Sequence, residues 1–504
     1  MNELSRKGKS SERSVEVISK YTLNEPFARA RIVREKTGQI KYLVEEVPLE
    51  EKDKKSLNEI KEFLSDELDV DVKSLGSTEK VETHLRKMVE GVVKNHRIKI
   101  EKGSLEKLMY YIIRDFIYFD KIDPLMRDPG VEDIGCNGYG LPVYIWHREY
   151  ESIPTNMVFE TSEELDRFVV KLTYMTRRAI SIAQPVVDAS LPDGSRVHLT
   201  YEKEVTRRGS SFSIRKFRVK PFTVTDLIAF NTLSADMAAW FWYLVENRAS
   251  VMVVGGTACG KTTTLNVLSM FIKPDAKIVS IEDTAELQLP HENWLPSVVR
   301  TGFGVTSKLA EITLFDLLKN AMRQRPEYII VGEVRGDEAY TLFQAIATGH
   351  GGLCSLHADS IEATIYRLET EPMNIPRSLI TTMDVIAVEA LMKMEGKSIR
   401  RIVSVSEVVG LDPTTKDLLT NDIFKWDPKK DTFTYYGRSY VLEKLARRFG
   451  VGYDEAVKEI DNRRLVLKWM TENSISDYKD VAKVIRSYYL NPAEFLEWIT
   501  VGKG

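Results

Sequence analysis

The chain has 504 residues, enough for two or three domains, and its apolar share of 43% and charged share of 29% are typical of a soluble globular protein. Its 71 basic and 74 acidic residues leave a net charge of −3, which gives no general reason to expect nucleic-acid binding, because that depends on an excess of Lys and Arg. Three widely spaced cysteines (Cys136, Cys259 and Cys354) support neither a disulfide framework nor a thiolate zinc site, and they favour a reducing cytoplasm.

The first part of the chain predicts two α+β modules. Residues 1–20 are charged and lack an apolar core, so we expect a flexible tail and no secretory signal. Alternating residues over 21–44 predict a hairpin that turns near Gly38, and helical patterns follow at 57–68, 83–94 and 105–118, giving a first module over 21–120. Strands at 143–147, 196–200 and 211–217 and a helix at 162–174 predict a second, PAS-like module over 121–217.

Residues 218–224 predict a linker, because Pro221 ends regular structure on its N-terminal side. Beyond the linker, expected strands alternate with helices over 225–504, which indicates an α/β domain with a parallel-rich sheet covered on both faces. The expected strands are 251–254, 277–281, 328–331, 353–356 and 385–389, and the domain closes with helices at 454–472 and 477–489. No apolar run approaches the ~20 residues of a membrane helix, so we expect any membrane association to be peripheral.

Residues 255–262 spell the phosphate-binding loop G-x-x-x-x-G-K-[ST] between an apolar strand and a helix. Such a turn directs successive backbone N–H groups and the positive helix end at a polyphosphate. Lys261 can then reach the β- and γ-phosphates, and the Thr262 hydroxyl can bind Mg²⁺. The pattern fixes only four positions, so a chance match is the alternative, which the strand–loop–helix context disfavours. The predicted nucleotide-binding residues are Gly255, Gly256, Thr257, Ala258, Cys259, Gly260, Lys261, Thr262 and Thr263.

Acidic residues follow two further expected strands. Glu282, Asp283 and Glu286 end the strand at 277–281, and Glu333 follows the strand at 328–331, with Gly332 where many P-loop enzymes have Asp. Because parallel strands present their carboxyl ends to the ligand crevice, these groups can hold Mg²⁺ waters or polarise the attacking water. A solvated turn would explain the first group as well.

Two histidines, His350 and His357, bracket the expected strand at 353–356. A zinc pair is one interpretation, but no Cys pair nearby completes a tetrahedral set. We therefore favour hydrogen bonding to the γ-phosphate.

Four segments, GGTACGKTT, SIEDTAEL, RQRPEYIIVGEVRGDEA and TGHGGLCSLHA, resemble in order the Walker-A loop, Asp box, atypical Walker B and His box of the type II/type IV secretion ATPase superfamily. QPVVDASLPDGSRVHL and LDPTTKDLLTNDIFKWDP are similar to its archaeal branch, which includes the archaellar motor ATPase and archaeal pilus ATPases. The resemblance covers roughly residues 21–500. Cys259 stands where the family usually has Ser, so oxidation sensitivity becomes a question, and the family's four-cysteine zinc motif is absent.

The resemblance implies a RecA-type, Mg²⁺-dependent ATPase that forms a cytoplasmic homohexamer. It would be held at the membrane through an integral-membrane platform protein and accessory archaellum or pilus subunits, and it would power filament assembly or secretion. Thr262 and Glu333 would hold Mg²⁺, partly through water. The candidate catalytic residues are Glu286, Glu333, His357, Arg215 and Arg323, with Arg196, Arg207, Arg208 and Arg325 as further arginine candidates. Which carboxylate polarises water, and which arginines act, stays open.

A RecA-type nucleic-acid motor, such as a helicase or translocase, is the alternative from another class. The near-neutral charge and the lack of a basic-aromatic run weigh against it, and we expect no nucleic-acid partner. A regulatory GTPase is disfavoured because no guanine-reading N-K-x-D sequence is present. Archaellum rotation, pilus assembly and export are not separable at this level.

Overall fold

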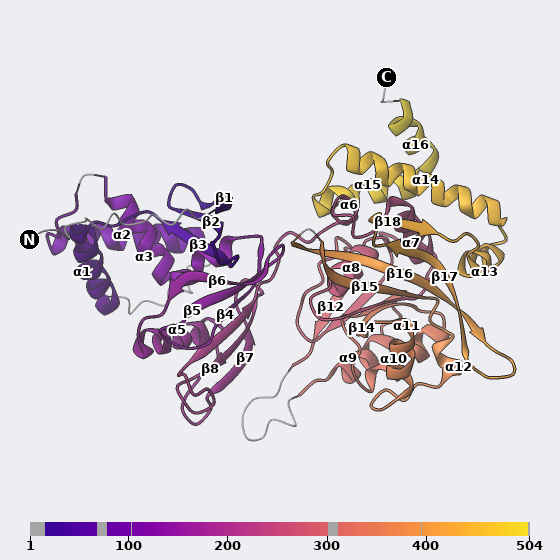
Figure 1. The fold of residues 1–504 in the computed structure, drawn as a ribbon, viewed down its shortest axis with the longest axis horizontal. Helices are drawn as coiled ribbons and strands as arrows, with labels where there is room; N and C mark the ends of the chain where they lie inside the picture. The colour runs from indigo at the N-terminus through magenta and orange to yellow at the C-terminus, as the bar shows by residue number, and fades with distance from the viewer. Residues whose placement is uncertain (1–15, 68–77, 102, 301–310, 395, 502–504) are drawn as a thin grey trace, which may run out of the picture. The chain divides into compact units, whose positions relative to one another are not determined.

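The computed structural model describes residues 16–67, 78–101, 103–300, 311–394 and 396–501. The chain divides into two units, Met1–Phe217 and Arg218–Gly504, and the division falls at the start of the predicted linker. Among the described residues, each unit contains one nine-stranded sheet (Figure 1).

The sheet of the first unit has the strand order β1-β2-β3-β6-β5-β4-β9-β8-β7. Neighbouring strands are antiparallel except for β3 and β6, which pair in parallel where Tyr42 faces Thr155. The strands are β1 (Glu16–Asn24), β2 (Ala28–Arg34), β3 (Ile40–Glu46), β4 (Val131–Cys136), β5 (Pro142–His147), β6 (Glu151–Val158), β7 (Val186–Ser190), β8 (Arg196–Thr200) and β9 (Ser211–Arg215). The two predicted N-terminal modules therefore share one sheet.

Two details of this unit bear on the sequence predictions. The hairpin of β2 and β3 is confirmed, with Gly38 at its turn in the left-handed region (φ 85°). The predicted tail over 1–20 is wrong for residues 16–20, which form the start of β1 and pair with β2. Residues 1–15 of that tail lie outside the described residues.

Amphipathic helices give the first unit a second apolar cluster, separate from that of the sheet. They are α1 (Glu51–Glu67), α2 (Thr78–Asn95) and α3 (Leu105–Phe116). The short η2 (Asp120–Ile122), α4 (Asp123–Arg127) and α5 (Ser162–Met175) pack in the cluster of the sheet instead. Ile60 of α1, Val89 of α2 and Ile112 of α3 are fully buried together, which is the stripe that their helical spacing predicts. The predicted helices at 57–68, 83–94, 105–118 and 162–174 are confirmed, although α1 begins six residues and α2 five residues earlier than predicted and residue 68 lies outside the described residues.

The sheet of the second unit has the order β12-β11-β13-β14-β10-β15-β16-β17-β18. Strands from β12 to β15 in this order are parallel, and β16, β17 and β18 extend the sheet antiparallel. The strands are β10 (Val251–Gly255), β11 (Ile278–Glu282), β12 (Trp294–Val298), β13 (Tyr328–Val331), β14 (Gly351–His357), β15 (Val385–Met394), β16 (Lys397–Leu411), β17 (Leu418–Asp427) and β18 (Thr432–Tyr435). The predicted α/β class, with a parallel-rich sheet, is confirmed.

Helices cover both faces of this sheet. In β10, Val251 and Val253 face one apolar cluster, and Met252 and Val254 face the other, as the pleat of a strand buried on both sides requires. The first cluster is covered by α6 (Val224–Ala229), α7 (Ala235–Glu246), α8 (Lys261–Ser269), α13 (Tyr440–Phe449), α14 (Tyr453–Glu472), α15 (Tyr478–Leu490) and α16 (Pro492–Val501). The second is covered by α9 (Leu314–Met322), α10 (Glu338–Ala347), α11 (Ile361–Glu369) and α12 (Arg377–Ile380).

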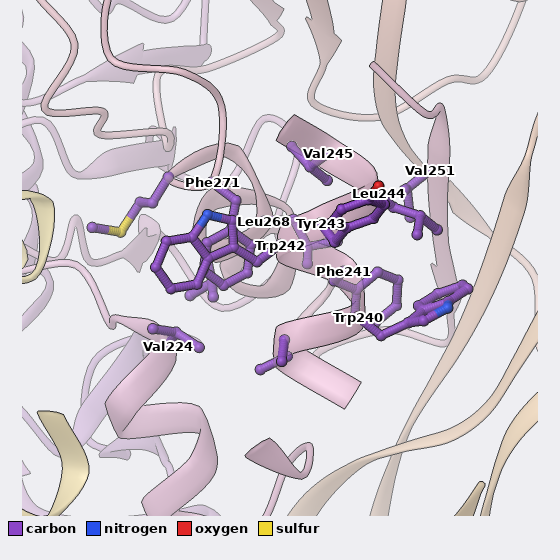
Figure 2. Packing of buried hydrophobic residues seen from close by; sticks show 14 of the residues in the cluster. Val224, Trp240, Phe241, Trp242, Tyr243, Leu244, Val245, Val251, Leu268 and Phe271 are labelled. Carbon is purple, nitrogen blue, oxygen red and sulfur yellow. The ribbon is translucent and has the colours of Figure 1, made fainter. Parts of the chain in front are cut away.

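Helix α7 is apolar on every side between Met237 and Val245. Its residues from Met237 to Val245 are all buried, and Trp242 stacks on Phe271 with ring centroids 5.4 Å apart (Figure 2). A helix without a polar face has to lie inside a core or a membrane. Within the part of the chain that the structure describes, no helix has the length and apolarity needed to cross a membrane.

Candidate nucleotide site

The phosphate-binding loop joins the end of β10 to the start of α8 and depends on its glycines. Gly260 caps the helix with a φ of 113°, a region that side chains disfavour. A Cβ on Gly255 would lie only 2.2 Å from the backbone oxygen of Glu389 on the neighbouring strand. Ala258 also has a left-handed backbone, with a φ of 59°. The predicted loop thus has a fixed backbone conformation at the amino end of α8.

Lys261 is folded back over this loop. Its Nζ donates hydrogen bonds to the backbone oxygens of Gly255 (3.0 Å) and Gly256 (2.7 Å). Thr262 and Thr263 follow in the first turn of α8 and are partly exposed. A positive side chain, a helix amino end and hydroxyl groups therefore converge at one place, which is the arrangement that binds a polyphosphate.

The predicted site residues gather at the carboxyl edge of the parallel strands. Gly255 lies in register with His357 at the end of β14, and Glu333 follows β13 after one residue. Glu282 ends β11, and Glu286 follows it in an exposed turn. The structure thus brings Lys261, His357 and the carboxylates to one edge of one sheet.

Glu282 holds the turn that carries Glu286. Its side chain is 3% exposed and its Oε1 accepts backbone N–H groups from Glu286 and Leu287, each at 3.0 Å. Burial raises the pKa of Glu282 to about 7, against the opposing effect of these two hydrogen bonds. The same side chain restricts position 332 to a small residue, because a Cβ on Gly332 would lie 3.1 Å from Cγ of Glu282. The glycine before Glu333 therefore makes room for the buried side chain of Glu282.

Arg335 is a site residue that the sequence analysis did not single out. Its guanidinium donates to Oε2 of Glu333 (3.1 Å from Nε) and lies 3.3 Å from Oδ2 of Asp283. It therefore joins the segment after β13 to the turn after β11. The sequence offered one indication of this role, because Arg335 follows Glu333 by two residues in a turn at the carboxyl end of an expected strand.

Three predicted residues lie at the other edge of the same sheet. His350 precedes β14, and its Nδ1 lies 3.0 Å from the backbone oxygen of Ala345, so the prediction that it contacts the γ-phosphate is wrong. Arg323 and Arg325 are exposed and precede the amino end of β13. The chain does not bring these arginines to its own phosphate-binding loop.

The remaining arginine candidates belong to the first unit. Arg215, on β9, pairs with Asp133 at 3.4 Å, and Arg196, on β8, pairs with Asp188 at 2.9 Å. Arg207 and Arg208 are exposed in the loop between β8 and β9. All four remain predictions.

Cys259 belongs to the loop but is buried, with 1% exposed, and its Sγ lies 2.5 Å from the place where a Cβ on Gly255 would be. Burial, together with the charge of Glu389, raises the pKa of its thiol to about 11. Because the thiolate is the reactive form, this cysteine is protected from oxidation at neutral pH in the folded chain.

The oxygen ligands offered at this edge fit Mg²⁺. The Thr262 hydroxyl and the Glu333 carboxylate are hard donors, and Mg²⁺ bound to a nucleotide takes few protein ligands because phosphates and water supply the rest. Among the described residues, no group of three or more His, Cys, Asp or Glu side chains is placed to hold a metal ion by itself. A protein-only metal cage is not needed for this chemistry.

This fold and this edge define a P-loop nucleotide-binding protein. The family described as "Type II/IV secretion system protein" matches residues 145–464, which is more than half of the chain. The chain therefore belongs to the type II/IV secretion system protein family, as the resemblance in its motifs predicts. The match takes in parts of both units.

Relatives come from archaea and bacteria. The chain is 38% identical over 401 residues to the uncharacterised protein MJ0900 of Methanocaldococcus jannaschii, covering 78% of this chain and 72% of the relative. It is 30% identical over 256 residues to a putative conjugal transfer protein of Mycobacterium tuberculosis, covering 49% and 71%. Among solved structures, it is similar to the VirB11 ATPase of the Brucella suis type IV secretion system (25% identity, 56% of this chain and 94% of that one, TM-score 0.28). It is also similar to the pilus retraction motor PilT with bound ADP (18% identity, 67% and 88%, TM-score 0.40).

Proposed function

We propose that the chain hydrolyses ATP and uses the energy to drive a secretion or filament-assembly machine. The observation that carries this proposal is the convergence of Lys261, Glu333 and His357, with the Glu282–Glu286 turn, at the carboxyl edge of one parallel sheet. The chain's membership of the type II/IV secretion system protein family supports the same function.

In this proposal, Lys261 leaves the carbonyl groups of its own loop and binds the β- and γ-phosphates. Glu286 or Glu333 polarises the attacking water, and His357 donates a hydrogen bond to the γ-phosphate. Bound Mg²⁺ would neutralise part of the phosphate charge, held by Thr262 and Glu333, partly through water. Arg335 orients Glu333, because it holds that carboxylate in a fixed place.

We further propose that the chain works as a homohexamer at the cytoplasmic face of a membrane. Arg323 and Arg325 are exposed at the sheet edge opposite the loop, so they can reach a phosphate only on a neighbouring subunit. An integral-membrane platform protein would receive the movement, and the driven filament would be an archaellum or a type IV pilus-like fibre. Arg215 of the first unit would supply charge to the nucleotide when the units close.

Hydrolysis of ATP by the full chain tests the proposal. The chain should release phosphate in the presence of Mg²⁺, and Lys261→Ala should abolish release and remove most nucleotide binding, because the loop loses its fixed positive charge. Lys273→Ala, in the exposed segment after α8, is the matched control and should keep normal turnover. Near-normal turnover by Lys261→Ala would show that this loop is not the active site.

A further inference from the structure

The two residues of the phosphate-binding loop that have a left-handed backbone are each held by a side chain from the strands beside the loop. Ala258 (φ 59°) accepts a hydrogen bond at its backbone oxygen from Nε of Arg400, at 3.0 Å. Gly260 (φ 113°) lies against Glu389, whose Oε1 is 2.5 Å from the place where a Cβ on this glycine would be. Neither Arg400 nor Glu389 belongs to the motifs that define the site.

The position of Glu389 is set by the sheet. It lies in the middle of β15, in register with Gly255 at the carboxyl end of β10. Its side chain reaches Gly260 of the loop, and the residue is 2% exposed. Burial raises the pKa of Glu389 to about 7, although the Thr264 hydroxyl and the positive charges of Arg400 and Lys261 act to lower this pKa. Oε1 of Glu389 lies 2.5 Å, and Cδ of Arg400 3.5 Å, from the place where a Cβ on Gly260 would be, so the two side chains lie beside each other there.

The backbone of Ala258 needs such support. An L-residue in the left-handed region is disfavoured by contact between its Cβ and the following carbonyl oxygen, and alanine has no polar side chain that could compensate. A conformation of this kind persists only where the surrounding structure holds it. The direction of the loop's N–H groups depends on it, because rotation of the Ala258 peptide would turn amide groups away from a bound phosphate.

We infer that Arg400 and Glu389 are positioning residues that keep the phosphate-binding loop in its anion-binding conformation. Arg400 acts by holding the backbone oxygen of Ala258, and Glu389 acts by filling the space beneath Gly260 and orienting Arg400. The inference deepens the proposed function and rests on it, because it concerns the same nucleotide site.

The test is a double-variant experiment on the full chain, with binding of ADP in the presence of Mg²⁺ measured by calorimetry. Arg400→Met should raise the Kd for ADP about ten-fold, which corresponds to the cost of one left-handed non-glycine residue. Adding Ala258→Gly should bring the Kd back to within about three-fold of the wild-type value, because glycine adopts this backbone without the clash. Ala258→Gly alone should change the Kd by less than about three-fold.

Steady-state ATP hydrolysis gives a second measurement. Arg400→Met should raise KM by about the same factor while kcat at saturating ATP falls much less, since bound ATP itself restores the loop. Arg400→Lys keeps the charge but not the fixed direction of the Nε–H group, so it should show a smaller rise that Ala258→Gly also reverses. Glu389→Ala should raise the Kd as well, because it leaves a gap beneath Gly260.

A Kd for Arg400→Met equal to that of the wild type would overturn the inference. A raised Kd that Ala258→Gly does not reverse would also overturn it, since Arg400 would then act on the nucleotide through its charge or by direct contact. Lys261→Ala distinguishes failure of this inference from failure of the proposed function. Loss of ADP binding in Lys261→Ala supports the proposed function whatever Arg400 does, whereas wild-type binding by Lys261→Ala would remove the site itself.

Discussion

Glu282 makes the stability of the second unit depend on pH, and replacing it with glutamine tests this. The folded chain raises the pKa of this carboxyl from 4.5 to about 7, so folding favours its neutral form. The contribution of the neutral Glu282 carboxyl to the free energy of unfolding is fully present below pH 4.5. It is lost as the pH rises through about 7. Worked from these two pKa values, the loss is about 3 kcal/mol at pH 8 and less than about 1 kcal/mol at pH 5.

Glutamine keeps the oxygen that accepts the two N–H groups of Glu286 and Leu287 and does not ionise. The free energy of unfolding of Glu282→Gln, relative to the wild type, should therefore rise by about 2.5 kcal/mol between pH 5 and pH 8. Urea unfolding followed by tryptophan fluorescence measures this, because Trp146 alone of the seven tryptophans lies in the first unit. Glu292→Gln, at an exposed site, is the control and should show the same difference at both pH values. A constant difference for Glu282→Gln would refute the buried, turn-holding role of this residue.

Two further predictions concern other parts of the second unit. Arg463→Met should destabilise this unit by about 3–5 kcal/mol in urea unfolding at pH 7, because the carboxylate of Glu246 would lose the buried guanidinium that lies 2.5 Å from it. The double variant with Glu246→Gln should recover part of this loss, and a loss below about 1 kcal/mol in the single variant would contradict the prediction. Residues 218–504 alone should bind ATP but hydrolyse it at a small fraction of the full-length rate, because the arginines of the first unit are missing. Full activity of this fragment in a phosphate-release assay would show that the first unit is only a docking surface.

The parts of the fold that follow from local sequence patterns were predictable. Apolar runs at 251–254 and 328–331 marked buried parallel strands, and the glycines of the loop marked the strand-to-helix turn at Gly255 to Gly260. Long-range pairing was not predictable in the same way. The pairing of β3 with β6, which joins the two N-terminal modules into one sheet, rests on the contact of Tyr42 with Thr155 across more than a hundred residues. The antiparallel extension by β16, β17 and β18 was missed because it breaks the βα alternation.

Site residues in local motifs were likewise predictable, and those brought together by long-range pairing were not. Lys261, Glu333 and His357 could be found because each follows a recognisable strand or loop in the chain. His350 was misplaced because a residue before a strand and one after it look alike in sequence, although they lie at opposite edges of the sheet. Arg400 and Glu389 could not be found, because only the pairing of β10 with β15, and of β15 with β16, brings them to the loop.

The most direct test of the central claim, that the carboxyl edge of this sheet hydrolyses ATP, is to measure ATP binding and phosphate release together in Glu333→Gln, and phosphate release in Glu286→Gln. The amide keeps the shape of the side chain but is far too weak a base to accept a proton from water. The account predicts that Glu333→Gln binds ATP with an affinity near that of the wild type, and that Glu333→Gln, Glu286→Gln or both release phosphate at least about 100-fold more slowly. Phosphate release at the wild-type rate by both variants would contradict it.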